Sequence, residues 1–154
     1  MSLLEPLLAP EICLCNVEAT SRKRVLQIIA QNLAREGLDE DAIFDSLMAR
    51  ERLGSTGLGD GVAIPHCRLP TPAIRVGLFT TSAPVNYDAA DGEPVDIFFV
   101  IVVPTEEREL HLKALAEIST ILANDDNRRS LRECVTSDEL HNTLVTLIES
   151  AQST

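Results

Sequence analysis

Basic residues are scarce in this sequence, and lysine occurs only twice, as Lys23 and Lys113. Lysine and arginine together number 13 against 24 acidic residues, which gives a formal net charge of −11. Such an excess of negative charge repels nucleic acids and anionic membrane surfaces. The short basic run from Arg22 to Arg24 opens a predicted helix and is typical of a solvated first turn. The composition therefore argues against nucleic-acid binding and favours a protein partner with a basic face.

Long apolar runs and paired cysteine motifs are also missing. No hydrophobic stretch is long enough to span a bilayer, and residues 1–20 lack the basic start and apolar centre of an export signal. Cys13 and Cys15 have the wrong spacing for a zinc knuckle, and Cys67 and Cys134 have no cysteine nearby in the sequence. We therefore expect a cytoplasmic protein with reduced thiols, no membrane insertion, no bound metal and no organic cofactor.

The hydrophobic pattern predicts an α/β fold in a single domain over residues 1–154, with helices on both sides of a mixed β-sheet. A chain of this length, 45% hydrophobic, can bury one core without covalent staples. The apolar residues of 95–103 are nearly continuous, which indicates a strand covered on both faces. The expected strands are 62–64, 74–82 and 95–103. The expected helices are 22–36, 40–52, 107–123 and a last one that follows a capping box at 136–139.

Glycine is scarce too, but four of the seven glycines fall in the window from Gly54 to His66. Crowded glycines let several backbone N–H groups converge on an anion, and histidine is a nucleophile that titrates near neutral pH. An isolated histidine is more often an ordinary surface or core residue. Here Pro65 fixes the backbone before His66, so the ring can be presented to solvent instead of being packed. The window therefore points to a phosphoryl group on His66.

Three common glycine-rich templates do not fit this window. A Walker A loop needs Gly-Lys before Ser or Thr, and neither lysine adjoins these glycines. A dinucleotide fingerprint fails because Val62 stands at the third glycine position after Gly57 and Gly59. The segment from Gly54 to Gly57 is one residue short of the nucleophile elbow of an α/β hydrolase. Nucleotide hydrolysis, dinucleotide binding and serine hydrolysis are therefore disfavoured.

A phosphoryl group on His66 would need hydrogen-bond donors and positive charge around it. Arg50 leaves the core side of the second helix in its last turn, and His111 points inward from the first turn of the third. Ser55 and Thr56 supply hydroxyl groups beside the glycines. Each also has a plainer interpretation: His111 as a core histidine, Arg50 as half of a surface ion pair, and the two hydroxyls as helix terminators.

The segment from Met48 to Leu69 closely resembles the active-site signature of phosphotransferase-system IIA proteins of type 2, the fructose/mannitol superfamily. Within that superfamily it is most similar to the nitrogen-regulatory type. Two further segments, Ser21 to Arg24 and Glu109 to Leu112, resemble the start of the family's first long helix and its second histidine segment. The resemblance covers about residues 3 to 149. These segments read Met-Ala-Arg-Glu-Arg-Leu-Gly-Ser-Thr-Gly-Leu-Gly-Asp-Gly-Val-Ala-Ile-Pro-His-Cys-Arg-Leu, Ser-Arg-Lys-Arg and Glu-Leu-His-Leu.

The resemblance implies a phosphotransferase component with a mixed sheet flanked by helices. It implies that His66 is phosphorylated on its tele nitrogen by a small HPr-like phosphocarrier. It further implies that His111 and Ser55 hydrogen-bond the phosphoryl group and that Arg50 stabilises its charge. Cys67 stands where many relatives carry glycine and is expected to be a small buried filler without a role.

The resemblance does not decide what the phosphorylated protein acts on. The nitrogen-regulatory type implies that the protein regulates partners in transport and in nitrogen or potassium metabolism according to its phosphorylation state. The alternative is a sugar-specific IIA component that passes the phosphoryl group to a IIB domain of a fructose or mannitol permease. A third hypothesis is a binding module with an inert histidine.

Overall fold

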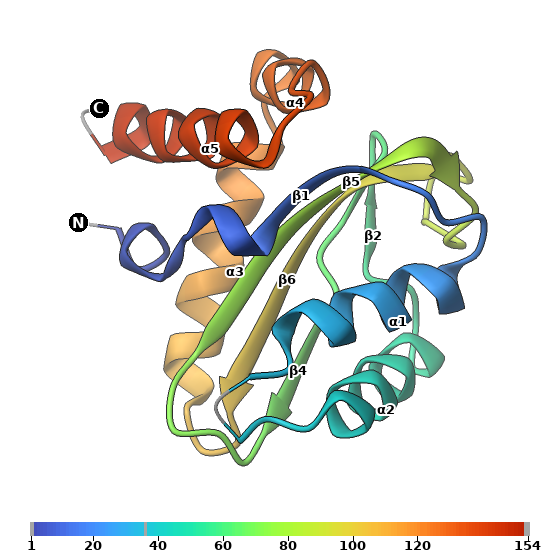
Figure 1. The fold of residues 1–154 in the computed structure, drawn as a ribbon, viewed down its shortest axis with the longest axis vertical. Helices are drawn as coiled ribbons and strands as arrows, with labels where there is room; N and C mark the ends of the chain where they lie inside the picture. The colour runs from blue at the N-terminus through green and yellow to red at the C-terminus, as the bar shows by residue number, and fades with distance from the viewer. Residues whose placement is uncertain (1, 36, 153–154) are drawn as a thin grey trace.

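The computed structural model describes residues 2–35 and 37–152. A mixed sheet of six strands lies between two layers of helices, as expected from the sequence (Figure 1). The strands are β1 (Cys13–Val17), β2 (Gly57–Gly59), β3 (Val62–Ala63), β4 (His66–Leu69), β5 (Arg75–Val85) and β6 (Val95–Pro104). The helices are α1 (Arg22–Leu33), α2 (Glu40–Arg52), α3 (Arg108–Leu122), α4 (Asp125–Arg132) and α5 (Ser137–Gln152). Two short 3-10 turns, Glu5–Leu7 and Pro10–Ile12, precede β1.

Strand β6 is the centre of the sheet. It pairs antiparallel with β5 and parallel with both β3 and β4, and β1 pairs parallel with β5 at one edge. Residues 97–103 of β6 are fully buried, which confirms the strand covered on both faces. Because β3 and β4 pair with successive parts of β6, Pro65 interrupts one continuous line of pairing just before His66. The pairing of His66 with Ile101 fixes where this histidine leaves the sheet.

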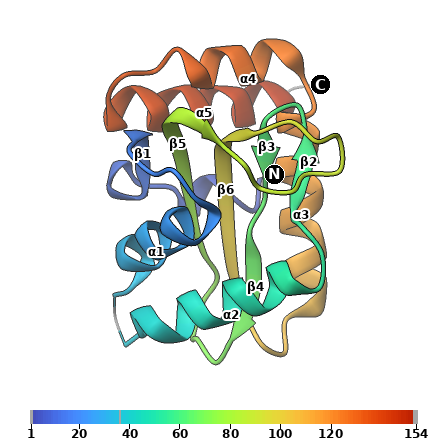
Figure 2. The ribbon, with the colours of Figure 1, turned by 90° about the vertical axis from the view of Figure 1, so that its right-hand side faces the viewer.

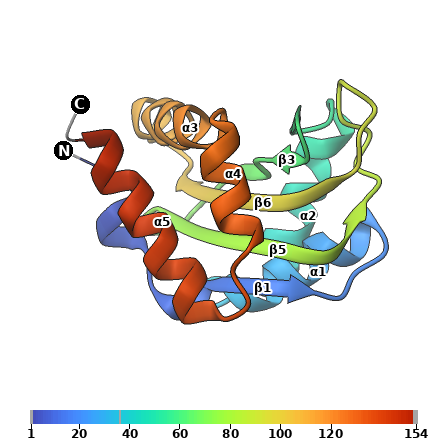
Figure 3. The same cartoon turned by 90° about the horizontal axis from the view of Figure 1, so that it is seen from above.

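The helices cover the two faces of the sheet unequally. In Figure 1, α1 and α2 lie on one side of the sheet, and α3 and α5 lie on the other. Helix α2 crosses the sheet next to β4, while α4 and α5 lie across the opposite end, as Figure 2 and Figure 3 show. His66 therefore starts a strand that is flanked by α2 on one face, near the beginning of α3.

Most expected elements are present, with shifted ends. Helix α2 has the expected bounds, and Thr136 caps α5 by accepting a hydrogen bond from the Glu139 N–H at 3.1 Å. Helix α1 ends at Leu33 because Ala34 is extended, and residue 36, the expected end, lies outside the described residues. Strands β1, β2 and β4 and helix α4 were not predicted. Among the residues described, no helix is both long and apolar enough to cross a membrane.

Candidate functional site

Helix α2 carries Arg50 to the site. Asp39 caps its start, since the side chain accepts a hydrogen bond from the Ala42 N–H. Ile43 and Leu47 lie on one stripe and are fully buried, and Arg50 continues that stripe into the last turn, where the helix leaves the core. The Arg50 guanidinium donates through Nη1 to the carbonyl of Gly54 at 2.8 Å. This bond ties the arginine to the start of the glycine-rich loop.

Both ring nitrogens of His66 are engaged. Nδ1 lies 2.8 Å from the carbonyl oxygen of Ile64, and Nε of Arg50 donates to Nε2 at 3.2 Å. A carbonyl oxygen only accepts and an arginine N–H only donates, so the proton resides on Nδ1 and the lone pair on Nε2. The backbone of the residue two positions earlier therefore selects the tautomer. Nε2 is the nitrogen available as a nucleophile.

His111 lies beside His66. Their ring centroids are 5.0 Å apart and the ring planes meet at 80°, so one ring presents its edge to the other. His111 belongs to the first turn of α3, as expected from the sequence. Its Nδ1 is buried and has no hydrogen-bond partner in the described part of the chain. The structure thus brings together three residues expected at the site, His66, His111 and Arg50.

The surroundings favour the neutral form of both histidines. Burial lowers the pKa of His66 most; its hydrogen bond to Ile64 and the charge of Glu51 oppose this change, and Arg50 adds to it. Burial also lowers the pKa of His111, with further contributions from His66 and the nearby arginines Arg68 and Arg50. Only a neutral imidazole has a lone pair with which to attack phosphorus. The site therefore favours the reactive form of His66.

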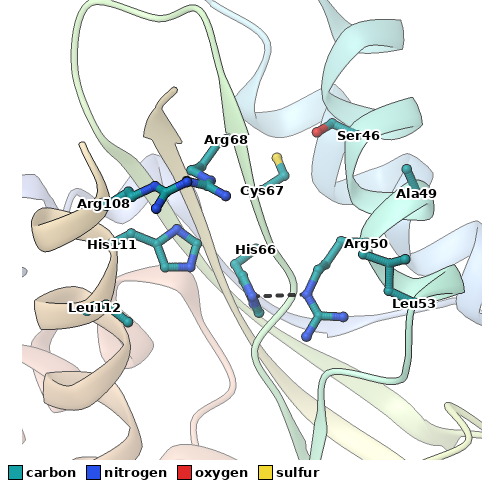
Figure 4. A pocket seen from close by; sticks show the side chains of 10 residues that line it. All are labelled: Ser46, Ala49, Arg50, Leu53, His66, Cys67, Arg68, Arg108, His111 and Leu112. Carbon is teal, nitrogen blue, oxygen red and sulfur yellow. Dashed lines mark hydrogen bonds between the residues drawn. The ribbon is translucent and has the colours of Figure 1, made fainter. Parts of the chain in front are cut away.

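These residues line an open cavity of about 810 Å³ (Figure 4). Among the residues that the structure describes, its walls carry three arginines and two histidines and no acidic side chain, although the chain as a whole is strongly acidic. Leu53 at the end of α2 and Leu112 on α3 are 85% and 67% exposed at the cavity, so its rim is apolar. The full lining is Ser46, Ala49, Arg50, Leu53, His66, Cys67, Arg68, Arg108, His111 and Leu112.

Two arginines of this cavity were not predicted from the sequence to belong to the site. Arg68 follows His66 by two positions on β4, and Arg108 precedes His111 by three positions on α3. Spacing by two on a strand and by three on a helix puts side chains on the same face, which is the signal that could have found them. Figure 4 shows both side chains in the part of the cavity wall near His111. No ion pair among the described residues neutralises either of them.

Ser55 and Cys67 occupy different positions relative to the cavity. The Ser55 hydroxyl donates to the Tyr87 carbonyl at 2.7 Å and accepts from the Gly57 N–H at 3.1 Å, and Ser55 is not among the lining residues. Cys67 reaches the cavity wall but is only 6% exposed, and burial raises its pKa to about 11. A buried, protonated thiol fits the expected filler. In the described part of the chain, no group of histidine, cysteine and acidic side chains is arranged to hold a metal.

Comparison with known proteins gives consistent matches over most of the chain. The profile of the phosphoenolpyruvate-dependent sugar phosphotransferase system EIIA 2 family matches residues 6–146. A nitrogen regulatory protein of Pseudomonas aeruginosa is 45% identical over 145 residues, which cover 92% of this chain and 94% of the relative. The crystal structure of nitrogen regulatory protein IIA-Ntr from Neisseria meningitidis superposes with a TM-score of 0.88 at 34% identity, over 93% of this chain and 99% of that one.

A more distant match supports the fold alone. The crystal structure of the mannitol IIA protein from Escherichia coli has a TM-score of 0.75 at 16% identity, over 92% of this chain and 98% of that one. Together with the closer matches, it confirms the expected mixed sheet flanked by helices.

Proposed function

This chain belongs to the EIIA 2 family of phosphoenolpyruvate-dependent sugar phosphotransferase systems, and we propose that it accepts a phosphoryl group on Nε2 of His66. The observation that carries the proposal is the pair of hydrogen bonds on the His66 ring. The Ile64 carbonyl holds the proton on Nδ1, and Nε2 faces Arg50 in an open, positively charged cavity. A nucleophile with its tautomer fixed beside a guanidinium is suited to a dianionic phosphoryl group.

The donor is an HPr-like phosphocarrier that carries its phosphoryl group on a histidine. The lone pair of Nε2 forms a new bond to phosphorus while the nitrogen–phosphorus bond of the donor breaks, and that electron pair stays with the donor histidine. No proton has to leave His66 during this step, because the Nδ1 proton remains hydrogen-bonded to the Ile64 carbonyl. The protein therefore needs to position the groups and to stabilise charge, without an acid–base pair.

Arg50 and His111 would stabilise the transferred group. Arg50 donates to Nε2 in the unphosphorylated protein, so its Nε–H must turn from the ring to a phosphoryl oxygen when phosphorus approaches. Its second bond, to the Gly54 carbonyl, keeps the guanidinium close during that change. His111 lies on the other side of the His66 ring and would hydrogen-bond the phosphoryl group. A hydrogen bond from Ser55 stays a prediction, since its hydroxyl would have to leave the Tyr87 carbonyl.

The output we propose is regulation of partner proteins in the cytoplasm. The relatives from Pseudomonas aeruginosa and Neisseria meningitidis are named nitrogen regulatory proteins, which favours this output over sugar transport. A phosphoryl group adds nearly two negative charges at a mouth rimmed by Leu53 and Leu112, so it would change any interface formed there without refolding. Targets in transport and in nitrogen or potassium metabolism fit this class of role.

The test is transfer from a phosphorylated HPr-like donor, followed by intact mass. The wild-type protein should gain an acid-labile phosphate. His66→Ala should gain none, because the accepting atom is gone, whereas His111→Ala should slow the reaction by about 10²–10³-fold. His141→Ala, on α5 and outside the cavity, is the matched control and should behave as wild type. A wild-type protein that never gains phosphate, or a His66→Ala variant that does, would overturn the proposal.

A second mixture separates regulation from sugar transport. The phosphorylated protein is incubated with IIB domains of fructose and mannitol permeases, and labelled phosphate is followed. We expect little transfer. Rapid transfer that is coupled to sugar phosphorylation would instead make the chain a sugar-specific IIA component.

A further inference from the structure

Glu51 is a buried carboxylate next to the site. It follows Arg50 on α2, is 3% exposed, and does not line the cavity. Within residues 2–35 and 37–152, no lysine or arginine lies within ion-pair distance of it. A charged group removed from water without a cation is costly unless several donors replace its hydration. The hydrogen-bond donors to Glu51 therefore identify the segments that this carboxylate connects.

Three hydrogen bonds converge on this carboxylate. Oε1 accepts from the backbone N–H of Thr56 at 3.0 Å, and Oε2 accepts from the Thr56 hydroxyl at 2.5 Å and from the Tyr87 hydroxyl at 2.9 Å. Thr56 and Tyr87 are themselves buried. Burial and the charge of Glu51 raise the pKa of Tyr87, so the phenol keeps the proton that it donates. The carboxylate thus joins the end of α2, the glycine-rich loop and the segment around Tyr87.

Glu51 is connected to each ring nitrogen of His66 through neighbouring residues and their hydrogen bonds. The Thr56 carbonyl accepts from the Ile64 N–H at 3.1 Å, and the Ile64 carbonyl accepts from Nδ1–H of His66 at 2.8 Å. On the other side, Arg50 precedes Glu51 directly and donates to Nε2 of His66 at 3.2 Å. We infer that Glu51 is the positioning residue of His66: it sets the Ile64 carbonyl that selects the tautomer and the Arg50 guanidinium that meets the nucleophilic nitrogen.

This inference deepens the proposed function, but the main measurement that tests the inference does not require the protein to be phosphorylated. The readout is the ¹⁵N NMR spectrum of the His66 ring in the unphosphorylated protein, which reports the tautomer and the pKa. The charged and titratable groups around the ring come from three elements. They are Arg50 and Glu51 on α2, Arg108 and His111 on α3, and Cys67 and Arg68 on β4. We expect wild-type His66 to be protonated on Nδ1 alone when it is neutral.

Glu51→Gln is the first variant. The amide removes the negative charge and turns an NH₂ group toward at least one of the donors that Glu51 now accepts from. We expect a mixture of His66 tautomers, a lower His66 pKa and phosphorylation slowed by about 10- to 100-fold, as for a small misplacement of reacting groups. Glu149→Gln removes one charge from an exposed position on α5 and is the matched control, with an unchanged His66 spectrum.

A pair of variants at Thr56 distinguishes a role of Glu51 in positioning His66 from a role in the stability of the fold alone. Thr56→Ser keeps both donors to Glu51 and should retain the wild-type tautomer, whereas Thr56→Val loses the hydroxyl and should shift the His66 spectrum in the direction of Glu51→Gln. Should Glu51→Gln fail to fold, this pair decides the question. The inference is overturned if Glu51→Gln or Thr56→Val lowers the melting temperature but leaves the His66 tautomer and pKa as in wild type. A lack of phosphorylation of the wild-type protein would refute only the proposed function.

Discussion

The imidazole rings of His66 and His111 meet edge to face, with their centroids 5.0 Å apart. The two rings cannot both be charged at this distance without repulsion, and burial disfavours the charge on each. The proximity of a second imidazole therefore helps to favour the neutral form of both histidines in the unphosphorylated protein.

The rate of phosphorylation should decrease at low pH. Because the pKa of His66 is lowered from 6.5, its ring stays neutral to a lower pH than the ring of an ordinary histidine. We expect the rate of transfer to fall to half of its value at high pH only below pH 6.5. Single-turnover transfer from a fully charged donor, measured against pH, checks this. A rate that rises as the pH falls through this range would contradict the nucleophile as described.

The same shifts affect stability. The unfolded chain binds protons on these histidines more readily than the folded protein does, so the free energy of unfolding should decrease as the pH falls below 6.5. Urea unfolding at a series of pH values measures this.

His66→Gln should raise the pKa of His111 in an NMR titration, because the protonated form of His66, which opposes a charge on His111, is no longer available. An unchanged His111 titration would mean that the two rings do not interact.

Arg50 should affect the pKa of His66 and the rate of phosphorylation in separable ways. Its charge lowers the pKa of His66, so Arg50→Ala should raise that pKa. The same variant should slow phosphorylation by about 10²–10³-fold, because a donor to the phosphoryl group is lost. Arg50→Lys retains the charge but not the paired donors to His66 and Gly54, and should recover the pKa better than the rate. Equal recovery of both by lysine would argue that only the charge matters.

The sequence predicts a helix or strand well where the residues of that element alone determine its structure. The apolar residues 97–103 require burial on both faces, and β6 is central. Helix α4 was not predicted because residues 125–132 are almost entirely polar; only Arg128 and Leu131 are buried, too few for an apolar stripe. Strand β1 is short and exists through parallel pairing with β5, about 65 residues away in the chain, which no local pattern reveals.

The same division holds for the site. His66, Arg50 and His111 were expected to be neighbours, and they are. The tautomer of His66 could not be predicted, because it depends on how the backbone turns back at Pro65 to present the Ile64 carbonyl. The direction of the Ser55 hydroxyl depends on Tyr87, 32 positions later, and was equally hidden. Long-range contacts of loops fix these details.

Arg68 and Arg108 should attract the phosphorylated donor. Neither forms an ion pair with another residue that the structure describes, so both add positive charge to the cavity. This charge steers an approaching phosphoryl group and is screened by salt. We expect Arg68→Gln with Arg108→Gln to reduce the second-order rate constant of transfer by about 10-fold at low salt, with a smaller reduction at high salt. Transfer rates at a series of salt concentrations measure both effects. An equal reduction at every salt concentration would point to lost contacts instead of steering.

Gly57 should not tolerate a side chain. A Cβ at this position would lie 2.7 Å from the Cβ of Ala89 and 3.0 Å from its Cα, so backbone would have to shift. We expect Gly57→Ala to lower the free energy of unfolding by about 1–3 kcal/mol. Ala89→Gly in the same chain should recover part of the loss, since it removes the nearer of the two atoms. Thermal unfolding of the single and double variants checks this, and a loss that Ala89→Gly does not reduce would place the strain elsewhere.

Cys67 should be inert in the folded protein although it is next to the nucleophile. Its pKa of about 11 leaves on the order of one thiolate in a thousand molecules at pH 8, and its sulfur is buried. We expect iodoacetamide to modify Cys67 only after unfolding, while the half-buried Cys15 reacts earlier. Peptide mass spectrometry after timed alkylation, in buffer and in denaturant, gives the two rates. Modification of Cys67 in buffer at the rate seen in denaturant would show that this wall of the cavity opens, and that the His66 ring is held less firmly than its hydrogen bonds indicate.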